Sequence, residues 1–96
     1  MKNSDIAQIF QNIADLLRLK GENQFKIRAY EKVARSIEQL SIGVEQIVAE
    51  GRVTEIPGAG EAITKKIYEL VTDGKLGYYE KLKSEFPNHQ PKSMHS

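Results

Sequence analysis

The residues with the clearest chemical potential form a glycine-bearing turn, Ile-Pro-Gly-Ala-Gly, at positions 56–60. Pro57 fixes one backbone angle, whereas Gly58 and Gly60 permit positive φ and carry no side chain that would block a ligand. A helix that begins directly after this turn would point its first backbone amides outward, and that arrangement binds phosphate. The backbone amides predicted to hold one phosphate are those of Gly58, Ala59, Gly60, Glu61 and Ala62.

Helical periodicity flanks this turn on both sides, and strand-like alternation is nearly absent from the chain. Apolar residues at i, i+3, i+4 and i+7 spacing predict a helix over residues 5–19, with Ser4 as its N-terminal cap. Asn23 is predicted to cap a second helix that ends near residue 40, with Phe25 close to its buried face. Further helices are predicted over residues 44–50, 61–73 and 78–85.

The turn and its two flanking helices together match a nucleic-acid-binding pattern. Ile56 before the turn, and Ile63 and Ile67 after it, are spaced to pack the flanking helices against each other. This is the pattern of a helix-hairpin-helix motif, which holds a nucleic-acid backbone without reading bases. An ordinary connection between two helices is the alternative. The predicted fold is an all-α bundle of four to five helices, with one domain over residues 1–86 and a disordered tail over residues 87–96.

Length and composition exclude several classes of protein. The chain has 96 residues, of which 40% are hydrophobic and 28% are charged, as expected for one small globular domain. It contains no cysteine, which excludes disulfides and thiolate-based chemistry. It has no acidic cluster of the kind that metal-dependent nucleotidyl transfer needs, and His89 and His95 lack further donors for a metal. No apolar run is long enough to span a membrane, so we expect a cytoplasmic protein.

The near-zero net charge of +1 hides an uneven distribution of charges along the chain. Residues 18–35 carry six basic and two acidic side chains, residues 36–64 carry one basic and five acidic, and residues 65–83 carry five basic and three acidic. Two basic stretches that meet in space would attract a polyanion such as DNA. A solvated surface of mixed charge is the alternative interpretation.

These features resemble the small amino-terminal domain of family X DNA polymerases, the group that contains DNA polymerase beta and the bacterial and archaeal PolX enzymes. The resemblance covers residues 4–82 and is closest to the bacterial and archaeal branch. Its carriers are the segments at positions 6–10, 13–17, 21–30 (Gly-Glu-Asn-Gln-Phe-Lys-Ile-Arg-Ala-Tyr), 56–60 and 73–76 (Asp-Gly-Lys-Leu). The family domain binds gapped DNA at a downstream 5′-phosphate, and some members remove 5′-deoxyribose phosphate by β-elimination through a lysine Schiff base.

The resemblance implies roles for individual residues. The Schiff-base lysine of the family falls on Lys66, whose nucleophilic form is the uncharged amine. The phosphate-binding lysine and its supporting tyrosine fall on Lys26 and Tyr30. Lys65 would add charge beside Lys66. Arg28 and Lys75 are plausible at the rim of the same surface. The alternatives are that the stem of Lys66 only covers the core and that Tyr30 is only a core tyrosine.

The chain also departs from the family pattern. Lysines of the family are replaced by Ala62 and Tyr78, although Lys75 or Lys81 could substitute for the second, and a family histidine is replaced by Phe25. The phosphate clamp is therefore thinner than in polymerase beta. No cofactor is required, but the family hairpin holds a monovalent cation, Na⁺ or K⁺, through backbone carbonyls. By position these would belong to Thr54, Ile56 and Ala59.

Three functions follow from these observations. The first is a DNA-binding module without sequence specificity for gapped or 5′-phosphorylated ends in repair, nucleoid-associated when bound, and part of or related to a family X polymerase. The second is a 5′-deoxyribose phosphate lyase that uses Lys66. The third is a non-catalytic protein-interaction bundle in which the motif is only structural. In the first two cases the partner is DNA, together with the remainder of a polymerase chain if this is one of its domains.

Overall fold

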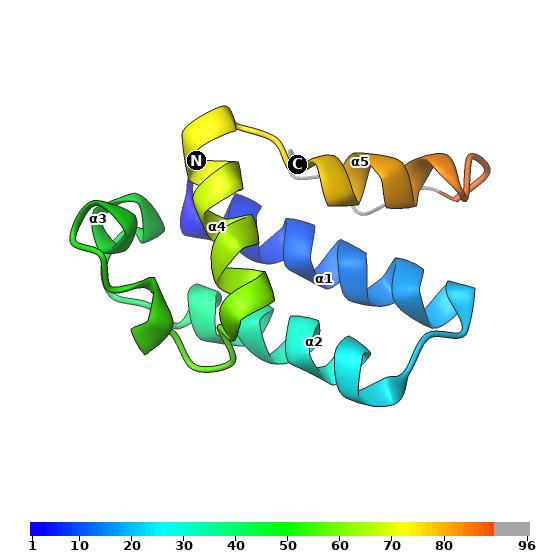
Figure 1. Ribbon diagram of the computed structural model, residues 1–96, viewed down its shortest axis with the longest axis horizontal. Coiled ribbons are helices and arrows are strands. Elements are labelled where there is room, and N and C mark those ends of the chain that lie inside the picture. Colours follow the sequence, from blue (N-terminus) through cyan, green and yellow to red (C-terminus); the bar gives the residue numbers. More distant parts are fainter. Residues whose placement is uncertain (90–96) are drawn as a thin grey trace.

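The computed structural model describes residues 1–89, and over that range it shows an all-α fold with no strand (Figure 1). The elements are α1 (Asn3–Lys20), α2 (Gln24–Glu38), α3 (Val44–Ala49), the 3-10 helix η1 (Val53–Glu55), α4 (Glu61–Asp73) and α5 (Gly77–Ser84). The predicted fold class is confirmed. After α5 the backbone of His89 closes a turn onto the carbonyl of Phe86. The rest of the predicted tail, with His95, lies outside the described residues.

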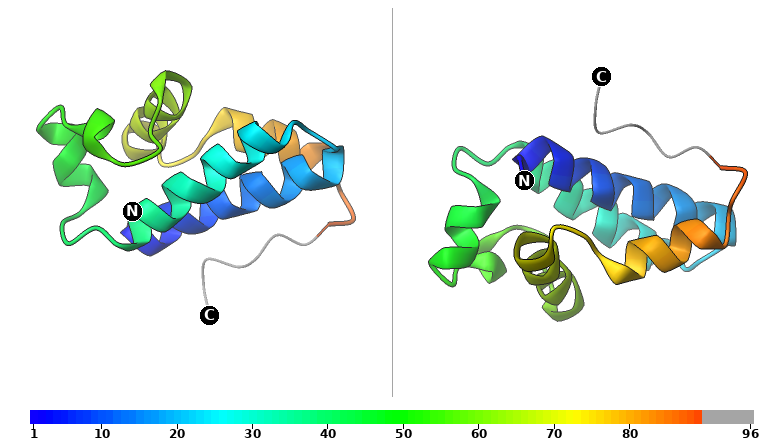
Figure 2. Two further views of the ribbon diagram at one scale, coloured as in Figure 1. Left: turned by 90° about the horizontal axis from the view of Figure 1, so that it is seen from below. Right: turned by 90° about the horizontal axis from the view of Figure 1, so that it is seen from above.

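The two longest helices form an antiparallel pair that supports the others. Gly21 ends α1 with a φ of +78°, and its amide bonds back to the last carbonyls of the helix, so the chain reverses within three residues. Figure 1 shows α4 crossing this pair steeply and α5 running beside α1, and the views in Figure 2 agree. Among residues 1–89, no helix is both long and apolar enough to cross a membrane.

The core lies where the apolar faces of the helices meet. Its center is the stripe of α1, which is almost fully buried. The largest fully buried side chains are Ile6, Phe10, Ile13, Leu16 and Leu17 of α1, Val33 and Ile37 of α2, Val44 of α3, Val53 of η1, Ile67 and Leu70 of α4, and Leu76 before α5. Because each element contributes to one core, the hairpin packs against the helical pair.

The start of α1 differs from the prediction. Ser4 lies inside the helix, the capping position is Lys2, and no side chain caps it. The neighbouring Asn3 has a longer reach: its amide donates to the carbonyl of Ile42 and its oxygen accepts from the backbone N–H of Val44, both at 2.8 Å. Asn3 therefore ties the start of α1 to the first turn of α3, because its side chain serves as a remote cap there.

The start of α2 matches one prediction and corrects another. Asn23 caps the helix by accepting from the backbone N–H of Phe25 at 2.7 Å. Phe25 itself is 80% exposed and takes no part in the core. It precedes the buried Ile27 by two positions, and two positions on a helix turn the side chain to the opposite face. The helix also ends at Glu38, two residues earlier than predicted.

Two polar contacts fix α5 in place. The amide of Asn12, buried in α1, donates to the hydroxyl of Tyr79 at 2.9 Å. The carboxylate of Glu69 on α4 accepts from the backbone N–H of Gly77, the first residue of α5, at 2.8 Å. Because these anchors come from two different helices, they set the position of Tyr78, which lies between Gly77 and Tyr79.

Candidate nucleic-acid interface

The turn at residues 56–60 joins η1 to α4 and packs as the sequence pattern predicts. Ile56, Ile63 and Ile67 are all buried, with at most 6% of each side chain exposed. Gly60 precedes the first residue of α4 and no side chain caps the helix there. The hairpin therefore presents an uncapped helix start at the surface, which is the feature that an anion site needs.

Only some of the five predicted amides are turned outward. The N–H of Ala59 donates to the carbonyl of Ile56 at 3.0 Å, and the N–H of Gly60 donates to the carbonyl of Gly58 at 3.1 Å. The amides of the first helical turn, Glu61, Ala62 and Ile63, have no intrahelical acceptor. The N–H groups of Ala59 and Gly60 are therefore engaged within the turn, whereas those of Glu61, Ala62 and Ile63 remain available to an anion.

Gly58 and Gly60 play different parts in this turn. Gly58 has a φ of +92°, and a Cβ built on it would meet Cγ of Lys32 at 3.1 Å and the backbone nitrogen of Val33 at 3.3 Å. Gly60 has a φ of −75°, and nothing lies within 4 Å of its Cβ position. Gly58 therefore allows the turn to pack directly against α2. Gly60, in contrast, does not adopt a positive φ.

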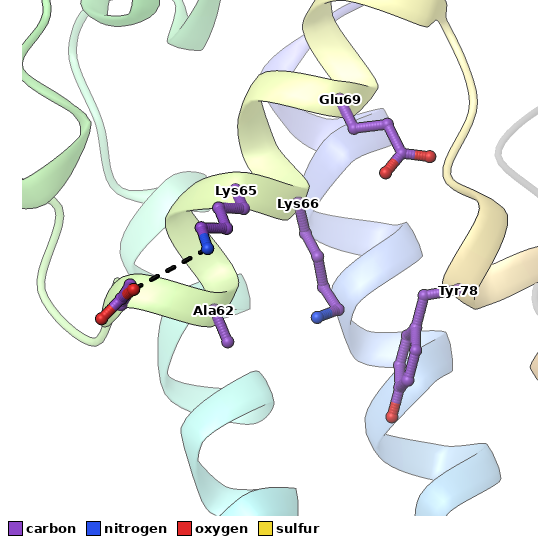
Figure 3. Close-up of a pocket in the computed structure, with 6 residues that line it drawn as sticks. Ala62, Lys65, Lys66, Glu69 and Tyr78 are labelled. Carbon is purple, nitrogen blue, oxygen red and sulfur yellow. Dashed lines mark ion pairs between the residues drawn. The ribbon is translucent and has the colours of Figure 1, made fainter.

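Beside the hairpin, an open cleft of about 400 Å³ contains the predicted nucleophile. Figure 3 shows Lys66 extending from α4 into the space beside the ring of Tyr78, while Lys65 points away from that ring. The ammonium nitrogen of Lys65 lies 3.7 Å from a carboxylate oxygen of Glu61. The ammonium nitrogen of Lys66 lies 4.6 Å from the centroid of the Tyr78 ring. A cleft that combines a half-buried lysine with an aromatic wall can take a sugar, because the ring covers one face of the ligand.

The electrostatic surroundings of Lys66 favour its uncharged amine. Burial, and the positive charge of Lys26 from α2, both lower the pKa of Lys66, whereas the carboxylate of Glu69 opposes them weakly. Glu69 is committed to the backbone N–H of Gly77, which keeps its carboxylate at the start of α5. The structure thus brings together two of the conditions that activate a lysine nucleophile: burial and a neighbouring cation.

This environment predicts how the reactivity of Lys66 depends on pH. A lowered pKa means that more of the amine is uncharged at any pH below its ordinary value. Reductive methylation of Lys66 by formaldehyde should therefore begin at lower pH in the folded protein than in the urea-unfolded chain. The Lys26→Gln variant should move the folded profile back toward higher pH. Mass spectrometry of the peptide that contains Lys66 measures both profiles, and coincident folded and unfolded profiles would contradict the prediction.

Tyr78 is the residue of this site that sequence reasoning missed. Its position was interpreted only as the loss of a family lysine, but its ring contacts the ammonium groups of Lys66 at 4.6 Å and Lys26 at 5.8 Å. It also stacks on Tyr30 at 6.2 Å with an angle of 8° between the rings. No local sequence pattern could reveal this role, because the residues that Tyr78 contacts lie on α2 and α4, far from α5 along the chain.

Tyr30 lies in the core, behind the ring of Tyr78. It is 4% exposed and stacks on Phe10 at 6.0 Å as well as on Tyr78. Burial raises the pKa of its hydroxyl well above the ordinary value, and Tyr78 raises it further. Tyr30 is thus a core residue that supports the Tyr78 wall from behind.

The other predicted basic residues do not all converge. Lys26 pairs loosely with Glu22 at 3.7 Å and faces Tyr78, so it belongs to the site. Lys65 is 78% exposed in the same cleft as Lys66. Arg28 lines a separate hollow on the other side of α2, and Lys75 is exposed in the loop after α4 and lines neither this hollow nor the cleft.

Comparison with known proteins agrees with this geometry. A family model described as a helix-hairpin-helix domain matches residues 1–76. The chain is 30% identical over 87 residues to the DNA polymerase/3′-5′ exonuclease PolX of Bacillus subtilis (strain 168), covering 91% of this chain. It is 29% identical over 83 residues to DNA polymerase lambda of Arabidopsis thaliana, covering 86% of this chain. It spans 15% of the length of each relative.

These matches confirm the resemblance to the amino-terminal domain of family X DNA polymerases that was inferred from the sequence. The matched part of each polymerase is its amino-terminal part, and the helix-hairpin-helix model includes the hairpin and all of α4. The same matches support DNA binding by this domain. From its hairpin geometry and from the family model, the chain belongs to the helix-hairpin-helix domain family, in the form found in the amino-terminal part of family X DNA polymerases.

Proposed function

We propose that this chain binds gapped or 5′-phosphorylated DNA without sequence specificity, as a repair module that is part of or related to a family X DNA polymerase. The observation that carries the proposal is the uncapped first turn of α4, directly after a glycine hairpin and beside Lys65, Lys66 and Lys26. Backbone amides and lysines recognise phosphate and not base edges, so the contact positions DNA without reading it.

Salt titration of DNA binding tests this proposal against a purely structural role for the motif. Each phosphate contact releases counterions, so the affinity for gapped DNA should fall steeply with salt, with a log–log slope of roughly −3 for three to four contacts. Lys65→Gln should make the slope shallower by about 1, because it removes one phosphate contact. Lys83→Gln is the matched control, since Lys83 lies over the Tyr79 ring and pairs with Glu80.

Two outcomes of the titration would count against DNA binding. Affinity that does not change with salt, or the absence of measurable binding at low salt, would favour the protein-interaction bundle. Equal affinity for two gapped DNAs of unrelated sequence is expected, and a strong preference for one of them would contradict the absence of sequence readout.

A second function is favoured by one specific observation, the Lys66 amine in its cleft with a lowered pKa. The uncharged amine would attack the C1′ aldehyde of a 5′-deoxyribose phosphate. Loss of water from the adduct then gives an imine. Loss of a C2′ proton then breaks the C3′–O bond, and the downstream strand leaves with its 5′-phosphate. Water finally hydrolyses the imine and frees Lys66. This is 5′-deoxyribose phosphate lyase chemistry, and it needs no cofactor.

The hairpin carbonyls are compatible with a bound monovalent cation. The carbonyl of Ile56 accepts from the N–H of Ala59 at 3.0 Å, and the carbonyl of Ala59 accepts from the Thr64 hydroxyl at 3.4 Å. A carbonyl oxygen has two lone pairs, so both retain capacity for an ion. We propose that Thr54, Ile56 and Ala59 hold Na⁺ or K⁺ there, which would add positive charge near a bound phosphate.

A further inference from the structure

A pocket beside α3 is lined mainly by apolar side chains. It has a volume of about 190 Å³ and lies between the loop after α2, the helix α3 and η1. An apolar cavity of roughly 150 Å³ can hold a molecule as large as benzene, so this pocket has room for one large apolar side chain. We call it the α3 pocket, and its lining includes Leu40, Ile42, Ile47, Ile56, Arg52 and Glu55.

The apolar residues of the α3 pocket form both its base and its edge. Ile47 and Ile56 are buried, with 5% and 2% of each exposed, whereas Leu40 and Ile42 are half-buried and pack against the core from outside. An apolar side chain that enters the pocket would cover surface that water now contacts. Removal of apolar surface from water drives most protein association, and a pocket that takes one anchoring side chain supplies much of the affinity.

The polar residues of the α3 pocket leave a negative charge at its rim. The guanidinium of Arg52 pairs with Glu50 at 2.9 Å and with Glu55 at 3.0 Å, so one carboxylate charge is left over. All three side chains are at least 40% exposed. The segment around the pocket, residues 38–56, holds one basic and four acidic side chains, although the whole chain has a net charge of +1. The surroundings of the pocket therefore attract a cationic group.

DNA does not fit these features. Its phosphates would meet the surplus carboxylate of Glu50 and Glu55, and like charges repel. The α3 pocket also shares no lining residue with the cleft of Lys66, which belongs to α4 and α5. A peptide segment that places an apolar residue beside lysines or arginines matches both the apolar base and the charge of the rim.

The α3 pocket and the end of α5 lie at opposite ends of α1. Asn3, at the start of α1, donates to the carbonyl of Ile42 in the pocket wall, whereas Lys20, at the end of α1, pairs with Glu85 after α5. With 18 residues, α1 is about 27 Å long. Figure 1 shows this separation, with α3 and the end of α5 on opposite sides of the molecule. This distance favours a segment of another protein as the occupant.

We propose that the α3 pocket is a docking site for a segment of a separate protein. The segment inserts one large apolar side chain and pairs adjacent lysines or arginines with Glu50 and Glu55. An interface of this size is typical of a transient complex. The inference does not depend on DNA binding, and it leaves the cleft of Lys66 open while the partner is bound.

Selection of binders from a phage-displayed library of random short peptides, with the whole chain as the target, tests the proposal. The enriched peptides should share a large apolar residue next to lysines or arginines. The best of them should shift the NMR amide resonances of residues 40–42, 47 and 52–56 in the isotope-labelled protein. Enrichment of no peptide, enrichment of peptides without basic residues, or resonance shifts on another surface would each contradict the proposal.

Two variants separate the apolar contribution from the electrostatic one. Ile42→Ser removes part of the apolar wall and should weaken binding of the selected peptide by about tenfold. The double variant Glu50→Gln/Glu55→Gln leaves Arg52 without a carboxylate partner and should weaken binding by about fivefold. Because both glutamates are exposed, the double variant should fold even if Ile42→Ser does not, and unchanged peptide affinity in it would overturn the proposal.

Glu80→Gln/Glu85→Gln is the matched control. Each of these glutamates also pairs with a basic side chain, Glu80 with Lys83 at 3.1 Å and Glu85 with Lys20 at 3.0 Å, and neither lines the α3 pocket. The control should keep its peptide affinity, and equal losses in the two double variants would show unspecific attraction and overturn the site. Gapped DNA should leave the resonances of residues 40–47 in place, and shifts there like those that the peptide causes would assign the pocket to DNA instead.

Discussion

Lys66→Ala is expected to abolish the covalent adduct that borohydride traps between this protein and gapped DNA carrying a 5′-deoxyribose phosphate. The loss should be at least about 100-fold, because the imine requires the amine that the substitution removes. Binding to the same DNA should weaken only modestly, since the amides of α4 and the other lysines remain. Gel electrophoresis of the trapped product, beside a direct binding measurement, separates the two effects.

Lys65→Ala is the matched control for this experiment. Lys65 precedes Lys66 on the same helix and lines the same cleft, but its ammonium group points away from Tyr78 toward Glu61 at 3.7 Å. It should keep most of the adduct. Lys66→Arg retains the positive charge without a nucleophilic amine and should resemble Lys66→Ala. An adduct that survives in Lys66→Ala would show that another lysine is the nucleophile.

Gly58→Ala is expected to destabilise the domain and to displace the hairpin from α2. The substitution places a side chain at a φ of +92° and brings its Cβ to 3.3 Å from the backbone nitrogen of Val33, where neither group yields easily. Together these effects should cost about 2–3 kcal/mol in the free energy of unfolding. For a domain of this size the thermal midpoint should fall by roughly 10 °C or more, which circular dichroism measures.

Gly60→Ala provides the comparison within the same turn. Gly60 has an ordinary φ of −75° and open space around its Cβ position, so its stability should change by less than about 1 kcal/mol. DNA binding by Gly58→Ala should be weaker than wild type even below its melting transition, because the first turn of α4 moves with the hairpin. Equal thermal midpoints for the two variants would refute the role assigned to Gly58.

Sequence reasoning located the elements because their apolar spacing and their glycines are local signals. Asn23 caps α2 as predicted, and Gly74 ends α4 with a φ of +75°. The hairpin could be found for the same reason, since Pro57, Gly58 and the spaced isoleucines all lie within a dozen residues. Lys66 was identified through family resemblance, and the structure places it in a cleft with a lowered pKa.

The structure corrects two predictions, one through a contact between distant segments and one through the geometry of a single helix. Ser4 is the standard cap residue near the start of α1, but Asn3 instead reaches across to α3, 41 residues away along the chain. Phe25 has a large apolar side chain of the kind found in cores, but its position on α2 directs that side chain outward. No local pattern identifies the role of Asn3, because its partner is brought near only by folding, whereas the outward position of Phe25 follows from its helical spacing to Ile27.

The sequence by itself determined that this is a small helical domain with a helix-hairpin-helix motif, since periodicity, capping and turn chemistry act over a few residues. The tertiary structure alone decided which of its lysines share a site. Lys26, Lys66 and Tyr78 come from three helices, and they meet because Asn12 and Glu69 fix α5 against α1 and α4. The charge and burial that set the reactivity of Lys66 arise from that packing, which depends on the relative placement of whole helices.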